Sequence, residues 1–170
     1  MDENIVIRTM VKSDIIAFYT AFKEQVWNKP AEIFEKYFKE QEVKERYVIV
    51  AEINNEVAGY ATLLPKDKNG PYSNMDIPTV CDFNVIIKYQ NRGIGTLILD
   101  KTEKIAAETC NRICLGVGLH SGYGSAQRMY VKRGYIPDGT GVWFNNANLK
   151  QYAECINNDD LILYMSKQLV

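Results

Sequence analysis

The sequence has one histidine and four cysteines, and no two cysteines form a C-x-x-C pair. The cysteines are Cys81, Cys110, Cys114 and Cys155. Zinc sites need Cys and His ligands at short, regular spacings, so we expect no metal site in this chain. Free cysteines most often behave as small buried apolar side chains. We therefore expect reduced, structural thiols, which are typical of a cytoplasmic protein.

Neither sign of charge is in excess. The chain has 20 Lys and Arg against 21 Asp and Glu, which gives a formal net charge of −1. Proteins that bind nucleic acid through its phosphates carry a basic excess, so this class of function is not expected. A net charge near zero gives little repulsion between copies, so a homodimer remains open.

Long apolar runs are also missing. No stretch approaches the 18 apolar residues that a membrane-spanning helix needs. The first residues, Met1-Asp2-Glu3-Asn4, lack the basic region and apolar run of a signal peptide. We expect neither a membrane span nor a secretory leader. A length of 170 residues with 46% hydrophobic and 24% charged residues predicts one globular domain over 1–170.

The apolar pattern predicts a mixed order of strands and helices. Ser13 is expected to cap a first helix with Ile15, Tyr19, Phe22 and Val26 on its buried face. Pro30 is expected in the first turn of a second helix. Further helices are predicted at 93–109 and 124–133, and strands at 5–7, 47–52, 57–64, 79–87, 113–119, 135–136, 142–144 and 161–165. This order favours an α/β or α+β fold with a mixed sheet. The aromatic residues of the first two helices pack the core or, alternatively, wall an acceptor pocket.

A glycine-rich turn follows the strand that begins at Thr79. It reads Gln90-Asn91-Arg92-Gly93-Ile94-Gly95-Thr96 and opens a predicted helix. Unpaired N–H groups and the dipole at a helix start can bind a phosphate. Ile98 stands where the dinucleotide fingerprint requires a third glycine, and the chain has no G-K-S or G-K-T. The turn alone fits either a phosphate site or a packing turn.

Together with other segments, the turn resembles a known family. Gln90 to Gly95 matches the Q/R-x-x-G-x-G/A motif of the GCN5-related N-acetyltransferase (GNAT) family. Ala126-Gln127-Arg128-Met129-Tyr130, continued to Gly134-Tyr135, is similar to the family's second motif. Ile7-Arg8 with Asp14, and Val57 to Ala61, resemble its opening and its third strand. The resemblance runs from about residue 5 to residue 168.

The resemblance implies a fold and a co-substrate. The fold is a mixed, mostly antiparallel sheet of six to seven strands flanked by about four helices, with a V-shaped gap between the fourth and fifth strands. The co-substrate is acetyl-CoA, and no metal is implied. Main-chain N–H groups at Val85 and Ile87 would meet the thioester and the pantetheine arm, and those from Arg92 to Thr96 the pyrophosphate. The residues implied in binding are Val85, Ile87, Gln90, Arg92, Gly93, Ile94, Gly95, Thr96, Ala126 and Tyr130.

The resemblance also implies catalytic roles. Tyr130 would donate a proton to the leaving thiolate, and Val85 would stabilise the oxyanion. Asp82, His120 or a water would take the proton of the attacking amine. Tyr123 stands where the family often has a cofactor-contacting Asn. The expected activity is acetyl transfer to a primary amine of a small molecule. A non-catalytic CoA-binding or interaction module and a protein or peptide N-acetyltransferase are the alternatives.

Overall fold

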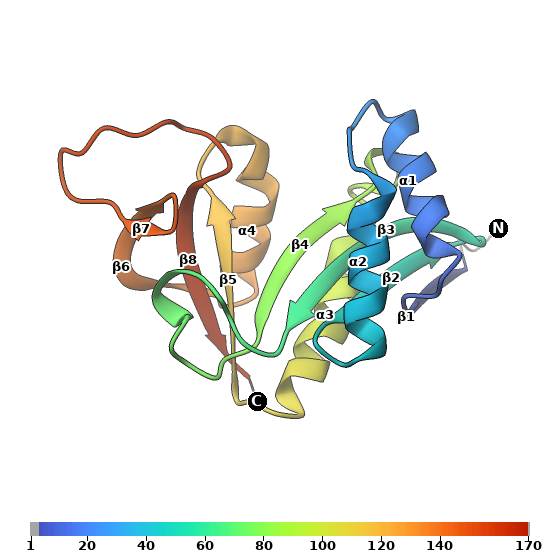
Figure 1. The fold of residues 1–170 in the computed structure, drawn as a ribbon, viewed down its shortest axis with the longest axis horizontal. Coiled ribbons are helices and arrows are strands. Elements are labelled where there is room, and N and C mark those ends of the chain that lie inside the picture. Colours follow the sequence, from blue (N-terminus) through green and yellow to red (C-terminus); the bar gives the residue numbers. More distant parts are fainter. Residues whose placement is uncertain (1–3, 170) are drawn as a thin grey trace. The chain divides into compact units, whose positions relative to one another are not determined.

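The computed structural model describes residues 4–169, so the predictions about Met1-Asp2-Glu3 lie outside the described residues. Within residues 4–169, eight strands form one mixed sheet in the order β1-β2-β3-β4-β5-β8-β6-β7, accompanied by four helices (Figure 1). The predicted class and the four helices are confirmed, and the strand count exceeds the expected six to seven. The chain divides into two compact units. The first unit contains the residues up to Leu64 together with Cys81–Ile105, and the second contains Pro65–Val80 together with the residues from Ala106 onward. One domain over 1–170 stays a prediction.

The first unit is built on an antiparallel meander. The strands β1 (Ile5–Thr9), β2 (Tyr47–Ile53) and β3 (Glu56–Leu64) pair in chain order. Between β2 and β3, Asn54 and Asn55 have φ of 50° and 68°, the geometry of a two-residue hairpin turn. Asparagine suits this tight turn because it adopts positive φ more readily than most residues.

Helices cover both faces of this meander. Side chains alternate along β3, so Gly59 and Tyr60 face opposite sides. The Tyr60 ring contacts the aromatic side chains of α1 (Asp14–Glu24) and α2 (Ala31–Glu42), namely Phe18 at 4.9 Å and Phe34 at 5.4 Å between ring centroids. On the other side, a Cβ built on Gly59 would lie 3.2 Å from Ile98 of α3 (Ile94–Ala107). The aromatic cluster forms the core of this unit.

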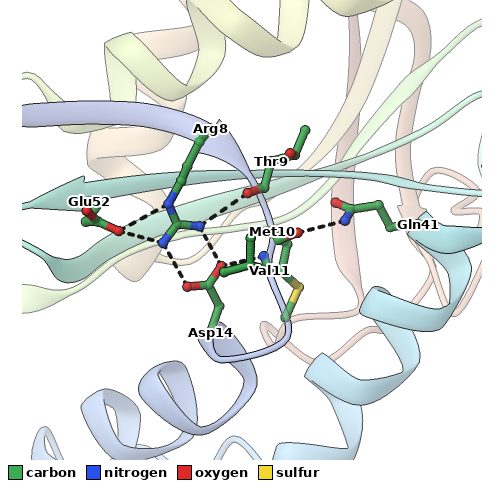
Figure 2. Close-up of polar contacts among 7 residues, drawn as sticks. All are labelled: Arg8, Thr9, Met10, Val11, Asp14, Gln41 and Glu52. Carbon is green, nitrogen blue, oxygen red and sulfur yellow. Dashed lines mark hydrogen bonds and ion pairs between the residues drawn. The ribbon is translucent and has the colours of Figure 1, made fainter.

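The start of α1 departs from the prediction. Ser13 makes no capping hydrogen bond. Instead the Asp14 carboxylate accepts the Val11 N–H at 2.8 Å and is held by Arg8 at 2.7 Å and 2.9 Å, while Arg8 also binds Glu52 at 2.6 Å (Figure 2). These contacts raise the pKa of Arg8, chiefly through its hydrogen bond to Asp14. The Arg8 and Asp14 pattern therefore fixes the turn between β1 and α1.

The buried face of α1 also differs. Its buried apolar residues are Ile15, Phe18 and Phe22, whereas Tyr19 is more than a third exposed. Val26 was expected on that face, but it lies beyond the helix with φ 60° and is 93% exposed. Ile15 and Phe22 are buried as predicted, whereas Phe18 takes the buried position that was predicted for Tyr19. Pro30 precedes the first residue of α2 instead of lying in its first turn.

The second unit contains β5 (Arg112–Gly118), α4 (Gly124–Lys132), β6 (Ile136–Phe144), β7 (Ala147–Asn148) and β8 (Leu161–Gln168). β8 pairs antiparallel with both β5 and β6, and β7 pairs with β6. The first residues of β4 (Thr79–Val85) run parallel to β5, Thr79 opposite Cys114 and Val80 opposite Leu115. The unpredicted strand is β7. Asn145 and Asn146 make another positive-φ turn in front of it.

All four cysteines are free, and Cys114 is fully buried in the core of this unit. Cys155 is exposed, so the expectation of buried structural thiols is wrong for that residue.

Candidate active site

A carboxylate on β4 gathers four donors from separate elements of the first unit. Oδ1 of Asp82 accepts from Lys29 Nζ at 2.6 Å and from Asn84 Nδ2 at 2.8 Å. Oδ2 accepts from the hydroxyl groups of Tyr37 and Tyr60, both at 2.7 Å. Lys29 lies between α1 and α2, Tyr37 on α2, and Tyr60 on β3. The contact with Asn84 places its side chain on the same side of β4 as that of Asp82.

The backbone at Asp82 is strained. Its φ is 39°, in the left-handed region that residues other than glycine rarely adopt within a strand. Such a conformation costs about 1–3 kcal/mol and persists only where surrounding contacts hold it. The four hydrogen bonds to the side chain supply such contacts. Outliers of this kind concentrate at functional sites, which supports the choice of Asp82 as a site residue.

The hydrogen bonding limits what Asp82 can do. An ionised carboxylate has about four acceptor positions, and all of them are engaged here. Accepting a proton from a substrate would displace one of these donors. The arrangement therefore suits an amine-orienting group better than a free base, the other role considered for this residue.

The two tyrosines of this network are held in the neutral form. Burial, and then the charge of Asp82, raise the pKa of both Tyr37 and Tyr60. Arg46 opposes the shift at Tyr37, since its guanidinium lies 4.5 Å from that ring centroid. Arg46 itself is held by Glu40 and by the hydroxyl of Thr62, at 2.5 Å and 2.8 Å.

The raised pKa values predict that these tyrosines ionise at a higher pH in the folded protein than in the unfolded chain. Tyrosine in an unfolded chain ionises near pH 10, while Tyr37, Tyr60 and Tyr130 have raised pKa values in the folded protein. Stability from these groups is therefore complete below about pH 10 and is lost as the pH rises above it. Absorbance at 295 nm should show fewer than the 11 tyrosines ionising near pH 10 in the native protein. In denaturant, all should ionise there. Full ionisation near pH 10 without unfolding would contradict the buried network.

The glycine-rich turn folds as predicted. After β4 ends at Val85, a short 3-10 turn at Ile87–Tyr89 leads to the exposed segment Asn91–Gly93. Gly93 has φ 79°, which a residue with a Cβ adopts only at a cost. The first helical bond of α3 runs from the Leu97 N–H to the Gly93 carbonyl at 3.2 Å. The N–H groups of residues 94–96 therefore precede the intrahelical ladder, as at any helix start.

Several contacts fix this turn. Gln90 donates its side-chain amide to the Val85 carbonyl at 3.1 Å. Tyr89 and Lys88 both bind Glu56, at 2.6 Å each, and these two contacts lower the pKa of Glu56. The Arg92 guanidinium lies 5.6 Å from the centroid of the Tyr89 ring. These contacts anchor the beginning of the turn, at Gln90 and Arg92.

One predicted main-chain donor is already engaged. The Ile87 N–H donates to Gln25 Oε1 at 3.0 Å, and Gln25 is the C-cap of α1. A ligand that used this N–H would have to displace the Gln25 side chain. The role of Ile87 in binding stays a prediction.

The remaining predicted residues lie in the second unit. Tyr130 is 6% exposed on α4, and its ring centroid lies 5.7 Å from that of Tyr135. Burial, and secondarily Tyr123, raise the pKa of Tyr130. Ala126 is one turn earlier on α4 and half-buried. The next residue, Gln127, donates to the Gly118 carbonyl at 2.8 Å and so ties α4 to the end of β5.

Both ring nitrogens of His120 are engaged. Nδ1 accepts the Gly122 N–H at 3.1 Å, so Nε2 carries the proton and donates to Asp159 at 2.9 Å. The Tyr123 hydroxyl donates to the same Asp159 oxygen at 3.0 Å. These contacts lower the pKa of Asp159, with His120 as the larger cause. His120 therefore links the end of β5 to the segment before β8, an arrangement that leaves it no free lone pair as a base.

A family comparison explains why these motifs occur together. The family model described as "Acetyltransferase (GNAT) family" matches residues 12–135. The chain belongs to the GNAT acetyltransferase family. A search of curated proteins finds no match to this GNAT chain.

Solved structures share the GNAT fold. An N-acetyltransferase from Staphylococcus aureus Mu50 superposes with a TM-score of 0.73 at 15% identity, covering 98% of this chain and 99% of that one. The ribosomal-protein-alanine N-acetyltransferase from Brucella melitensis gives 0.70 at 20% identity, covering 96% and 99%. yncA from Salmonella typhimurium, solved with its cofactor acetyl-CoA, gives 0.70 at 17% identity, covering 98% and 94%. Because the sequence identities are this low, these superpositions show a shared fold and no more.

Residues 4–169 of this GNAT chain contain neither a membrane-spanning helix nor a metal-binding cluster. No helix there has the length and apolar character to cross a membrane. No group of three or more His, Cys, Asp or Glu side chains in that range could hold a metal ion.

The sequence did not reveal the partners of Asp82. Lys29, Tyr37 and Tyr60 are 53, 45 and 22 residues away from it in the chain. No local pattern links residues at such distances. The one available clue was the acidic residue itself, since a carboxylate inside a strand of a GNAT sheet requires donors from neighbouring elements.

Proposed function

We propose that this protein transfers the acetyl group of acetyl-CoA to a primary amine, with a small molecule as the acceptor. The observation that carries the proposal is the strand–turn–helix from Val85 to Thr96, which lies inside the segment that matches the GNAT family. It supplies main-chain donors at a helix start, where anions bind. The proposed location is cytoplasmic.

The residues of the turn fit the phosphate part of acetyl-CoA. The N–H groups of residues 94–96 are available to a pyrophosphate, and Arg92 adds a positive charge beside them. A Cβ built on Gly93 would meet nothing within 4 Å, so the surroundings leave room for a ligand at the backbone. Gln90 holds the Val85 carbonyl and thereby the end of β4. Ala126, which is small, and Val85 and Ile87 complete the proposed binding residues.

The proposed reaction is direct attack by a neutral amine on the thioester carbon. A carbon–nitrogen bond forms, the carbon–sulfur bond breaks, and the amine gives up a proton. The Val85 N–H stabilises the developing oxyanion. Binding both substrates together replaces a bimolecular encounter with a positioned one.

Tyr130 serves the leaving sulfur. Its raised pKa keeps it protonated throughout the neutral range. Full proton transfer from such a phenol to a thiolate with a pKa near 8.5 is uphill. Tyr130 therefore acts first as a hydrogen-bond donor to the sulfur. The proton of the amine leaves through water, since the contacts of Asp82 and His120 favour orienting and linking roles for those residues.

A peptide acceptor is the second candidate. It is favoured by structural likeness to a ribosomal-protein-alanine N-acetyltransferase, at 20% identity. The small-molecule proposal is favoured by the hydrogen-bond network at Asp82, in which the Lys29 side chain is only 19% exposed.

The test is release of CoA thiol from acetyl-CoA in the presence of an amine panel. The panel should hold alkylamines, polyamines, amino acids and a peptide with an N-terminal alanine. We expect turnover with one of the small amines. Turnover with the peptide alone would establish the second candidate. Binding of acetyl-CoA with no turnover on the whole panel would instead favour a non-catalytic CoA-binding module.

A further inference from the structure

The ammonium group of Lys29 occupies a place built for a cation. We propose that Asp82, Phe22 and Tyr60 form a binding site for an unbranched alkyl primary ammonium, which Lys29 fills until a ligand displaces it. The proposal rests on the proposed function in one respect, since the ligand of this site would be the acetyl acceptor. The binding itself does not require catalysis.

The geometry is that of ammonium recognition. Lys29 Nζ lies 2.6 Å from Asp82 Oδ1, a charge-assisted hydrogen bond. The same nitrogen lies 5.4 Å from the centroid of the Phe22 ring and 5.3 Å from that of Tyr60. Ring faces within about 6 Å attract a cation. One carboxylate with two aromatic rings thus surrounds one ammonium group.

The site does not depend on Lys29 for its construction. Tyr37, Tyr60 and Asn84 continue to donate to the carboxylate of Asp82 if the lysine leaves. Phe22 and Tyr60 are held in the core by their contacts with Phe34, at 6.0 Å and 5.4 Å between centroids. The Asp82 carboxylate and the two rings therefore keep their positions when Lys29 leaves, and Asp82 keeps its strained backbone.

Lys29 lies in an exposed segment between α1 and α2. The residues between α1 and α2 include Val26, which is 93% exposed, and Trp27, which is about half exposed. In this segment the Lys29 N–H donates to the Trp27 carbonyl, a contact within the same loop. The loop is tied to α1, because the Val26 and Trp27 N–H groups donate to the Lys23 and Phe22 carbonyls. Rotation of the Lys29 side chain alone would carry its ammonium out of the site.

The length of Lys29 defines the ligand class. A lysine side chain carries four methylenes before its ammonium, and here that ammonium lies by the rings of Phe22 and Tyr60. A ligand with a straight alkyl chain and a terminal primary ammonium reproduces both parts. A branched or negatively charged neighbour to the nitrogen would meet apolar rings or the Asp82 carboxylate instead.

The test is binding of n-butylammonium without acetyl-CoA, so that it stands apart from turnover. Lys29→Met should bind n-butylammonium at least about tenfold more tightly than the wild type, because the internal competitor is gone. Lys29→Met/Asp82→Asn should lose this gain, and 1-butanol should not bind. Lys66→Met, which breaks the exposed ion pair with Asp76, should match the wild type.

The proposal fails if Lys29→Met binds n-butylammonium no more tightly than the wild type. It also fails if adding Asp82→Asn leaves the gain intact. Should Lys29→Met not fold, Lys29→Gln provides the same comparison with a polar side chain of similar length. Tight binding to Lys29→Met together with an inactive amine panel would retain this site and reject the acetyltransferase. Turnover on the amine panel, without tighter binding of n-butylammonium to Lys29→Met, would support the acetyltransferase and reject this site.

Discussion

Tyr130→Phe should lower kcat for acetyl transfer about 100-fold while leaving the affinity for acetyl-CoA nearly unchanged. A positioned proton or hydrogen-bond donor contributes about 10²–10⁴-fold to a reaction of this kind. Phenylalanine keeps the ring that packs against Tyr135 but lacks the hydroxyl. The raised pKa of Tyr130 also means that its own deprotonation should cause no fall in kcat below pH 10. Steady-state kinetics with the best acceptor, together with direct binding of acetyl-CoA, measure both effects.

The matched control is Tyr135→Phe, the same chemical change on the neighbouring buried ring. Its kcat should stay close to that of the wild type. Equal losses at the two positions would indicate a packing effect and remove Tyr130 from the chemistry. Undiminished kcat in Tyr130→Phe would assign protonation of the leaving group to water.

Gly59→Ala should lower the free energy of unfolding by about 3 kcal/mol, the upper part of the range for overpacking a core. A Cβ at this position would lie 2.7 Å from the Asn84 carbonyl oxygen and 3.1 Å from the Cα of Val85. Both atoms belong to the backbone of β4, so no side-chain rotation relieves the contact. The strand must move, and with it the main chain proposed to bind the thioester. Chemical denaturation measures the stability, and the KM for acetyl-CoA should rise in the same variant.

Gly124→Ala provides the control for this substitution. Gly124 has φ −56° and ψ −40°, and a Cβ there would meet nothing within 4 Å. The change should be neutral or should stabilise the protein by about 0.4–1 kcal/mol, because alanine has less freedom in the unfolded chain. If Gly59→Ala were equally neutral, the close approach of β3 and β4 would not constrain the fold.

The strand–turn–helix of the site was predictable because its causes are local. An apolar strand, glycine at Gly93 and an apolar helix at Ile94 determine that segment from adjacent residues. The hairpin at Asn54 and Asn55 is local in the same way. The prediction failed at the start of α1, where neighbouring side chains compete for the same backbone groups. Ser13 has the right side chain to cap α1, but Asp14 is held by Arg8 from β1 and accepts the Val11 N–H instead.

The family, the order of elements and the position of the glycine turn could be predicted, since they depend on residues close together in the chain. The role of Asp82 depends instead on contacts that form when the chain folds. Its donors reach it from 53, 45 and 22 residues away. Likewise, His120 is engaged by Asp159, 39 residues along the chain. Hydrogen bonds depend on distance in space, and folding alone brings such residues within 3 Å of one another.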